Sequence, residues 1–496
     1  MSKTSTGVKG LMVFLWCVSV AALLILPANP GQLAKSLSSC TSLRKVDAKS
    51  FALCLYDAVA KGPSLLNHLY YKLYPPFPFG SQPEVLMPPP EDWVPSLSAK
   101  WFAPFFSGGG YSSEALSFVN YLSKKVTLGV MQHGDSVNEQ YLRGMGIQAH
   151  KMLSDATRKR LDPKATVEIC HSEPGAWSVP TPMYPTSECP TPQGLYSVGR
   201  TMFETDRLPE GWAERLNRMD EIWVPARFHV TTFLAGGVDP SKIHIVPEAV
   251  DTELFDPEDM DPLEIYDGDH RYKFLSVFKW EERKGWDVLL RAYFSEFSEK
   301  DDVLLTIRTY AYHSESNFRE QIDAFGRKEF PDKAESGSLP AIHLLTKDMD
   351  VDQMPRLYKA NDAFVLPSRG EGWGRPHIEA MAMGLPAIAT NWSGNTEFMN
   401  DWDSYPIPIE GLVPVREGAF KGHLWADPSV PALREIMRHC FQHPSQAREV
   451  GRAGMRHVRE NYNPDMVGEV VMKHLYRIEG KIRDSVHFAK NRPNEL

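Results

Sequence analysis

One stretch decides the fold of this sequence: Glu371-Gly372-Trp373-Gly374-Arg375-Pro376-His377-Ile378-Glu379. The apolar run before it, residues 363–367, predicts a buried parallel strand. The pattern after it, residues 378–383, predicts a helix that ends at Gly384. We therefore expect a strand–loop–helix crossing with two glycines in the turn.

This crossing has the features of a site for phosphate and sugar hydroxyl groups. Pro376 suits the first helical position, because its missing N–H would have no partner there. The glycines allow the backbone to approach a ligand closely, and the helix N-terminus favours phosphate. Glu371 and Glu379 can accept hydrogen bonds from neighbouring hydroxyl groups. A phosphate combined with sugar hydroxyls indicates a nucleotide-sugar.

The stretch resembles the Glu-x7-Glu signature of group 1 retaining glycosyltransferases (family 4, GT-B fold). The resemblance continues through residues 385–390 and 393–397, and upstream through residues 278–285. It implies two Rossmann-like α/β domains that face a cleft. It also implies sugar transfer from a nucleotide-sugar to a hydroxyl acceptor, which is a glycan, lipid or protein, with retention and without a metal or another cofactor.

The cationic candidates are Lys279 and Lys284, which end a predicted strand where open α/β sheets bind ligands. The family has Arg-x4-Lys-Gly here, whereas this chain has a lysine at the first position. The resemblance implies that both cations face the donor diphosphate and neutralise charge on the leaving nucleotide. Replacing arginine by lysine keeps the charge but loses bidentate geometry.

The resemblance also assigns roles to the two glutamates. Glu379 would hold the ribose hydroxyls and Glu371 the transferred sugar. The main chain around Gly372, Trp373, Gly374 and Arg375 would hold sugar and phosphate. Arg375 departs from the aliphatic residue that is usual in the family, and it either adds charge near the donor or pairs with an acid.

Further candidates come from the first half of the chain. The family pattern places Gly109 and Gly110, in the turn 108–110, at the cleft, and it places a histidine that touches the donor sugar near His171. A packed structural histidine is the alternative. Arg200 and Glu204 follow a predicted strand, where they would position an acceptor or form a structural ion pair.

Two other motifs resemble metal and cofactor sites. The acids of Asp348-Met349-Asp350-Val351-Asp352 resemble a metal motif, but they precede a predicted helix, where acids are ordinary at an N-terminus. The turn 108–110 lacks the G-x-G-x-x-G pattern of a nicotinamide site.

At Glu248-Ala249 the family usually has Asn-Gly. A catalytically silent binding protein of the same fold is the alternative function, and a pyridoxal-dependent phosphorylase would need a lysine motif that we do not find.

Composition limits the class of protein. The 496 residues suffice for two domains, and 42% hydrophobic with 24% charged residues is typical of a globular chain. A net charge of −9 argues against nucleic acid as a partner. The six cysteines have no zinc spacing. Cys40 with Cys54, and Cys170 with Cys189, could pair in an oxidising compartment.

Residues 1–30 predict a membrane anchor. Residues 11–26 carry no charge, and Lys3 and Lys9 precede them. This favours an uncleaved signal anchor and a single-pass protein of the Golgi or endoplasmic reticulum. A cleaved signal peptide or an organelle presequence is the alternative.

The rest of the chain divides into four parts. We expect a stem at 31–96, an acceptor domain at 97–250, a nucleotide-sugar domain at 270–463 and a helix at 464–496 that crosses back to the first domain. Strands that alternate with helical patterns indicate parallel sheets. The expected strands are 100–104, 126–131, 165–170, 196–201, 221–225, 243–247, then 274–278, 303–307, 342–345, 363–366 and 387–390.

Overall fold

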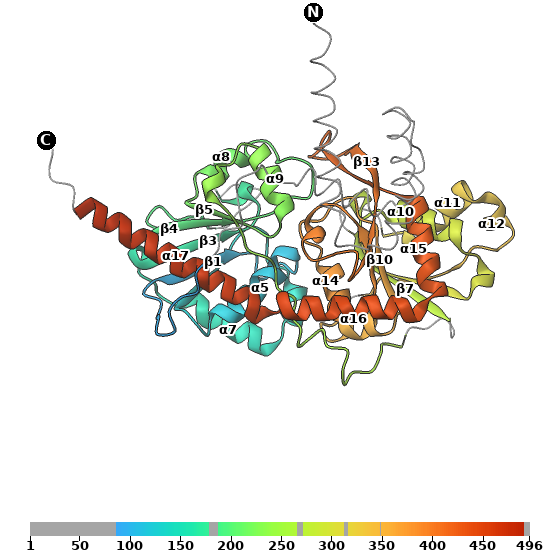
Figure 1. Ribbon diagram of the computed structural model, residues 1–496, viewed down its shortest axis with the longest axis horizontal. Coiled ribbons are helices and arrows are strands. Elements are labelled where there is room, and N and C mark those ends of the chain that lie inside the picture. The colour runs from blue at the N-terminus through green and yellow to red at the C-terminus, as the bar shows by residue number, and fades with distance from the viewer. Residues whose placement is uncertain (1–85, 178–186, 265–270, 312–315, 348, 491–496) are drawn as a thin grey trace, which may run out of the picture. The chain divides into compact units, whose positions relative to one another are not determined.

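The computed structural model describes residues 86–177, 187–264, 271–311, 316–347 and 349–490, without the side chains of 486–490. The first α/β domain is built on a six-stranded parallel sheet in the order β2-β1-β3-β4-β5-β6 (Figure 1). Its strands are β1 (Ser98–Ala103), β2 (Leu128–Gln132), β3 (Thr166–His171), β4 (Tyr196–Arg200), β5 (Glu221–Val224) and β6 (Ile243–Ile245).

A second six-stranded parallel sheet follows in the order β12-β11-β10-β7-β8-β9. An antiparallel hairpin of two further strands follows it along the chain. The strands are β7 (Tyr272–Trp280), β8 (Val303–Ala311), β9 (Ala341–Leu345), β10 (Ala363–Leu366), β11 (Ala387–Thr390), β12 (Tyr405–Ile407), and then β13 (Ile409–Pro414) and β14 (Leu424–Pro428).

The helices connect these strands as expected for parallel sheets. They are α5 (Gly110–Leu122), α6 (Glu139–Gly144), α7 (Ile147–Thr157), α8 (Trp212–Asn217), α9 (Arg227–Ala235), α10 (Trp286–Glu296), α11 (Phe318–Glu329), α12 (Pro331–Glu335), α13 (Gln353–Lys359), α14 (Arg375–Ala382), α15 (Val430–Gln442), α16 (Pro444–Asn461) and α17 (Pro464–Lys490). Short 3₁₀ turns are η1 (Pro163–Ala165), η2 (Pro174–Ala176), η3 (Pro240–Lys242), η4 (Glu282–Lys284), η5 (Glu299–Asp301) and η6 (Gly394–Glu397).

Burial explains why the strands read as continuous apolar runs. Every residue of β10 and β11 is buried, because each of these strands has a strand on both sides and helices pack against the sheet. β10 pairs with β7 at Ala363 and Phe274 and with β11 at Phe364 and Ala387. The predicted parallel sheets in two α/β domains are therefore confirmed.

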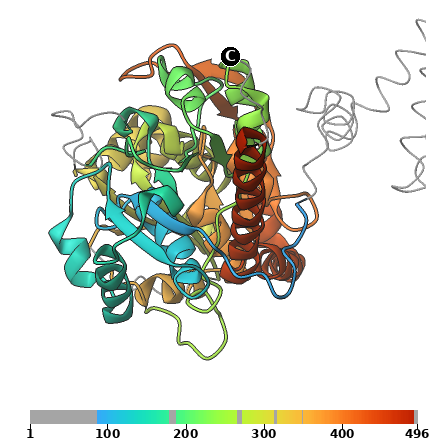
Figure 2. The same cartoon turned by 90° about the vertical axis from the view of Figure 1, so that its left-hand side faces the viewer.

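The C-terminal helix α17 lies beside the first domain, next to α5 (Figures 1 and 2). Gly468 of α17 leaves room for the ring of Tyr121 on α5, since a Cβ there would lie 2.2 Å from that ring. Arg477 forms a bidentate ion pair with the buried carboxylate of Glu221 on β5. These contacts fasten the end of the chain to the first sheet.

Some local expectations need correction. The N-cap of α5 is Gly109, and the Ser113 hydroxyl, which could have capped the helix, donates to main-chain carbonyls of the first turn. Asp352 precedes α13 but makes no side-chain capping bond. Pro376 is the second residue of α14, after Arg375. Gly384 does follow the end of α14 with a positive φ of 75°, as a helix stop requires.

Cysteine pairing is resolved in the described part of the chain. Cys170 at the end of β3 forms a disulfide with Cys189, and Cys440 is a buried thiol. Cys40 and Cys54 lie outside the described residues, as do the predicted anchor at 1–30, most of the stem and Asp348. No helix among the described residues is long and apolar enough to span a bilayer.

Candidate functional site

The structure joins the two motifs of the second domain through Lys284 and Glu371. Lys284 lies in η4, directly after β7, and Glu371 lies in the loop between β10 and α14. The Lys284 ammonium donates to both carboxylate oxygens of Glu371, at 2.8 and 2.7 Å. Burial by itself raises the pKa of Glu371, but the charges of Lys284 and then Arg283 outweigh it and bring the pKa to about 2. Glu371 is therefore a carboxylate at neutral pH.

Arg283 is a second cation at this place, and the sequence analysis gave it no role. Its guanidinium lies 2.7 Å from Glu281, 3.1 Å from Glu204 and 3.4 Å from Glu371. Glu204 comes from the segment after β4, so this guanidinium links the first domain to the Glu371 loop. The sequence-level alternative of an ion pair between Glu204 and Arg200 is therefore wrong.

The Glu371 loop is held against the turn after β11. The main-chain N–H of Glu371 donates to the Ser393 hydroxyl at 2.8 Å, and the N–H of Gly394 donates to the Glu371 carbonyl at 3.0 Å. A Cβ on Gly394 would lie 1.9 Å from the carbonyl oxygen of Gly372. Only glycine permits this approach. Ser393 is buried and is therefore part of the loop packing.

The side chain of Trp373 points into the protein core. Its ring contacts Phe398 and Tyr462, with centroids 4.9 and 5.7 Å away. The indole of Trp373 therefore anchors the loop.

Glu379 lies on the first turns of α14 and is held from two sides. The hydroxyl of Tyr358, on α13, donates to one carboxylate oxygen at 3.0 Å. The Arg375 Nε lies 3.8 Å from the other oxygen. Burial raises the pKa of Glu379, whereas the charge of Arg375 and the bond from Tyr358 lower it.

Lys279 is the residue before the last of β7 and lies close to Lys284 and Arg283. Burial lowers its pKa; the neighbouring Lys284 and Arg283 act in the same direction, and Glu281 opposes them. Three cations therefore gather at the end of β7, where the resemblance places the donor diphosphate. Among the described residues no three His, Cys, Asp or Glu side chains are arranged to hold a metal ion.

The first-domain candidates form a separate buried group. His171 accepts a bond from the Trp101 indole at 3.0 Å and contacts Glu114 at 2.9 Å, and its side chain has no exposed surface. Arg200 donates to the same carboxylate of Glu114 at 2.7 Å and is equally buried. The contacts of His171 and Arg200 are those of a structural charge cluster, so neither presents a polar atom to a substrate in this structure.

The glycine turn lies next to this cluster. Gly109 is the N-cap of α5 and Gly110 its first residue. The ring of the following residue, Tyr111, lies 5.5 Å from His171, and its hydroxyl lies 3.2 Å from that of Thr201. The turn therefore adjoins the carboxyl ends of β3 and β4, the edge at which ligands bind in open α/β sheets.

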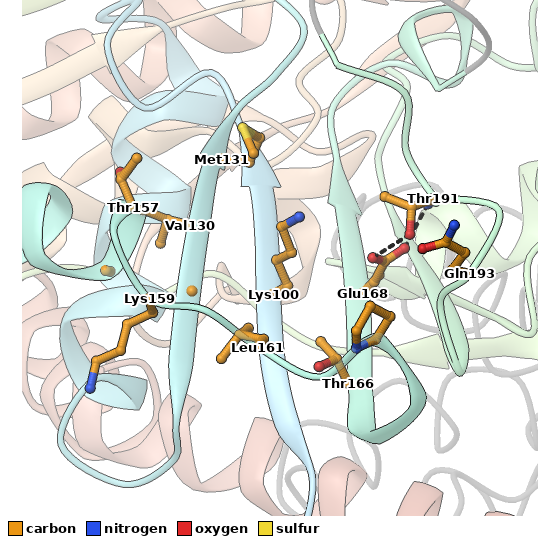
Figure 3. Close-up of a pocket in the computed structure, with 13 residues that line it drawn as sticks. Lys100, Val130, Met131, Thr157, Lys159, Leu161, Thr166, Glu168, Thr191 and Gln193 are labelled. Atoms are coloured by element: carbon orange, nitrogen blue, oxygen red, sulfur yellow. Dashed lines mark hydrogen bonds between the residues drawn. The ribbon is translucent and has the colours of Figure 1, made fainter.

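A pocket of about 260 Å³ lies elsewhere in the first domain (Figure 3). The side chain of Lys100 enters it from β1, and the carboxylate of Glu168 is occupied by bonds from the N–H and hydroxyl of Thr191. None of the predicted site residues lines this pocket.

Residues 260–413 match the family model of group 1 glycosyl transferases. The match falls largely in the second α/β domain and covers less than half of the chain. That domain contains the site formed by Lys284, Glu371 and Glu379, together with Arg283, Tyr358 and Ser393, which the sequence analysis did not assign. Arg283 was detectable as the neighbour of Lys284, whereas Tyr358 and Ser393 are brought in only by the fold.

The chain is similar to glycosyltransferases over part of its length. It is 27% identical over 243 residues to the D-inositol 3-phosphate glycosyltransferase of Acidothermus cellulolyticus, covering 47% of this chain and 49% of that one. It is 26% identical over 198 residues to an Escherichia coli galactosyltransferase, UDP-Gal:alpha-D-GlcNAc-diphosphoundecaprenol alpha-1,3-galactosyltransferase, covering 35% and 43%. The matches span less than half of these relatives.

The fold is also found in solved structures. HepE of Anabaena, solved with UDP and glucose, superposes with a TM-score of 0.54 at 11% identity, over 77% of this chain and 100% of that chain. At this identity the match supports the two-domain α/β fold.

Proposed function

We propose that this protein transfers a sugar from a nucleotide-sugar to a hydroxyl acceptor, with retention of configuration and without a metal ion. The observation that carries the proposal is the contact of Lys284 with Glu371 at the end of β7. It brings the cation and the carboxylate of two separate motifs together inside a group 1 glycosyl transferase domain. The similarity to transferases that use nucleotide-sugars supports the donor class.

The proposed reaction needs no base from the protein. The acceptor oxygen forms a bond to the anomeric carbon on the face from which the nucleoside diphosphate departs, while the bond from that carbon to the phosphate oxygen breaks. The acceptor proton moves to the departing phosphate. Lys284, Lys279 and Arg283 stabilise the negative charge that grows on the diphosphate. Glu371 holds hydroxyls of the transferred sugar, and Glu379 those of the ribose.

We expect a nucleoside diphosphate to bind with metal ions removed. Three cations at the end of β7 supply the positive charge that a metal ion would otherwise provide. Isothermal titration calorimetry of the whole protein measures this binding. The ligands are UDP, GDP, ADP, CDP and TDP, each titrated once with EDTA and once with added Mg²⁺. UDP is the first choice because HepE binds it. Binding that vanishes with EDTA and returns with Mg²⁺ would overturn metal independence. Binding of none of the five would overturn the donor class.

We also propose that the two domains lie in an oxidising compartment, such as the lumen of the endoplasmic reticulum or Golgi. The disulfide between Cys170 and Cys189 supports this, since such bonds are rare in the cytosol. We expect a linked Cys170–Cys189 peptide when protein from its source cells is alkylated without reductant and mapped by mass spectrometry. Cys440, a buried thiol, is the internal control and should appear alkylated after unfolding. Two alkylated cysteines at 170 and 189 would place the domains in a reducing compartment.

A further inference from the structure

Arg375 and Glu248 are two positions at which the sequence departs from the family pattern, and the structure brings them into contact. The Arg375 guanidinium lies 3.6 Å from the Glu248 carboxylate and donates to the carbonyl of Ala249 at 3.3 Å. Glu248 follows β6 of the first domain, whereas Arg375 begins α14 in the second. Since one departure supplies a cation and the other its counter-ion, the two changes form a matched pair.

Glu248 needs this partner because its surroundings disfavour a second negative charge. Only 2% of its surface is exposed. Burial, and then the nearby carboxylate of Glu114, raise the pKa of Glu248 well above its usual range, although Arg375 and Arg200 oppose the rise. A buried carboxylate without a paired cation is costly. The guanidinium of Arg375 is therefore drawn towards the first domain and kept there.

The same guanidinium lies beside Glu379. Its Nε is 3.8 Å from one carboxylate oxygen, and the Tyr358 hydroxyl donates to the other at 3.0 Å. These are the charged and titratable groups that face Glu379, and they come from α14 and α13. The charge of Arg375 favours the ionised form of Glu379, which burial disfavours. An ionised carboxylate is the form that accepts two hydroxyl hydrogen bonds.

We propose that Arg375, held by Glu248, is a positioning residue that fixes the Glu379 carboxylate for the two ribose hydroxyls of the donor nucleotide. This inference rests on the proposed function, in which Glu379 receives those hydroxyls. Arg375 acts through Glu379 and not on the reacting atoms. Its loss should weaken recognition of the ribose and leave recognition of the diphosphate largely intact.

The test is titration of the whole protein with UDP and with 2′,3′-dideoxy-UDP, or with the corresponding pair for GDP or ADP should that nucleotide bind more tightly. Wild-type protein should prefer the nucleotide with both hydroxyls. In Arg375→Leu, affinity for UDP should fall about tenfold or more, the range expected for hydrogen bonds to a charged group, while affinity for the dideoxy nucleotide changes little. Arg452→Leu, an exposed arginine on α16, is the matched control and should behave as wild type.

Two further measurements sharpen the result. Glu248→Gln should give a UDP affinity between those of wild type and Arg375→Leu, because it weakens the contact that holds the guanidinium and leaves the arginine in place. The UDP affinity of Arg375→Leu should drop further at pH 6 than at pH 8, because without the arginine Glu379 takes up a proton more readily. The inference about Arg375 would be overturned if Arg375→Leu bound UDP as wild type does, or if it lost equal affinity for both nucleotides. In either case, binding of UDP by wild type would still support the proposed function. Failure of wild type to bind any of the five diphosphates would count against the proposed function itself.

Discussion

Lys284→Ala is expected to lower turnover by about 10²–10³ while the protein remains folded. Negative charge grows on the diphosphate as the glycosidic bond breaks, so a fixed cation beside it stabilises the transition state more than the bound substrate. Loss of one preorganised group of this kind typically costs about that factor. The measurement is steady-state transfer from the nucleotide-sugar, with circular dichroism as the test of folding. Lys284→Arg keeps the charge and should retain part of the activity.

The contact with Glu371 adds a stability effect that must be separated from catalysis. Lys284 is 8% exposed, and removing one partner of a buried pair can cost about 3–5 kcal/mol; Arg283 remains nearby and reduces that cost. The double variant Lys284→Ala with Glu371→Gln leaves no uncompensated carboxylate, so it should recover stability but not turnover. Near wild-type turnover in folded Lys284→Ala would remove this lysine from the mechanism.

The stability effect should also depend on pH in a defined direction. The folded-state pKa of Glu371 is about 2, below the value of about 4.3 for an unfolded glutamate. The pair therefore stabilises the protein above the unfolded value, and its contribution is lost as the pH falls towards 2. The difference in urea midpoint between wild type and Lys284→Ala should accordingly narrow below pH 4.

The parallel sheets were predictable because their signal is local. Central strands such as β10 and β11 are buried on both faces, so each appears as a short apolar run between loops. The edge strand β12 contains Pro406 and spans three residues, and β13 alternates half-buried with exposed positions without a fully buried residue. These elements owe their conformation to neighbouring chain segments, which sequence patterns do not report.

The site was predictable only where a motif carried it. The resemblance identified Lys284, Glu371 and Glu379, but it could not reveal that the first two contact each other across 87 positions of sequence. It also placed a histidine that touches the donor sugar near His171, with a packed structural histidine as the alternative, and in this structure both His171 and Arg200 contact the buried Glu114. Glu114 lies inside a helical pattern and is unremarkable in sequence. Partners of buried charges are set by tertiary packing, so charge clusters of this kind are the part that sequence reasoning misses.

Gly285→Ala is expected to destabilise the protein by more than about 3 kcal/mol, which is large for a single methyl group. Gly285 has a φ of 66° and a ψ of 31°, a left-handed conformation that costs a non-glycine residue about 1–2 kcal/mol. A Cβ there would also lie 2.0 Å from the carbonyl oxygen of Pro367. Because that atom belongs to the backbone directly after β10, relief of the clash requires the ends of β7 and β10 to separate.

Gly211→Ala separates the two causes. Gly211 is also the N-cap of a helix, α8, with a φ of 75°, but the nearest atom to an added Cβ is the mobile end of Arg215 at 3.4 Å. This control should show the conformational cost of about 1–2 kcal/mol alone. Urea unfolding of both variants gives the difference, which measures the clash with Pro367. Since Lys284 precedes Gly285 and the Glu371 loop follows Pro367, the clash should displace their 2.7 Å contact, and turnover should fall in Gly285→Ala but not in Gly211→Ala. Equal unfolding midpoints for the two variants would show that the backbone after β7 and β10 can move apart at no cost in stability. The close approach at Gly285 would then not be what holds Lys284 and Glu371 together.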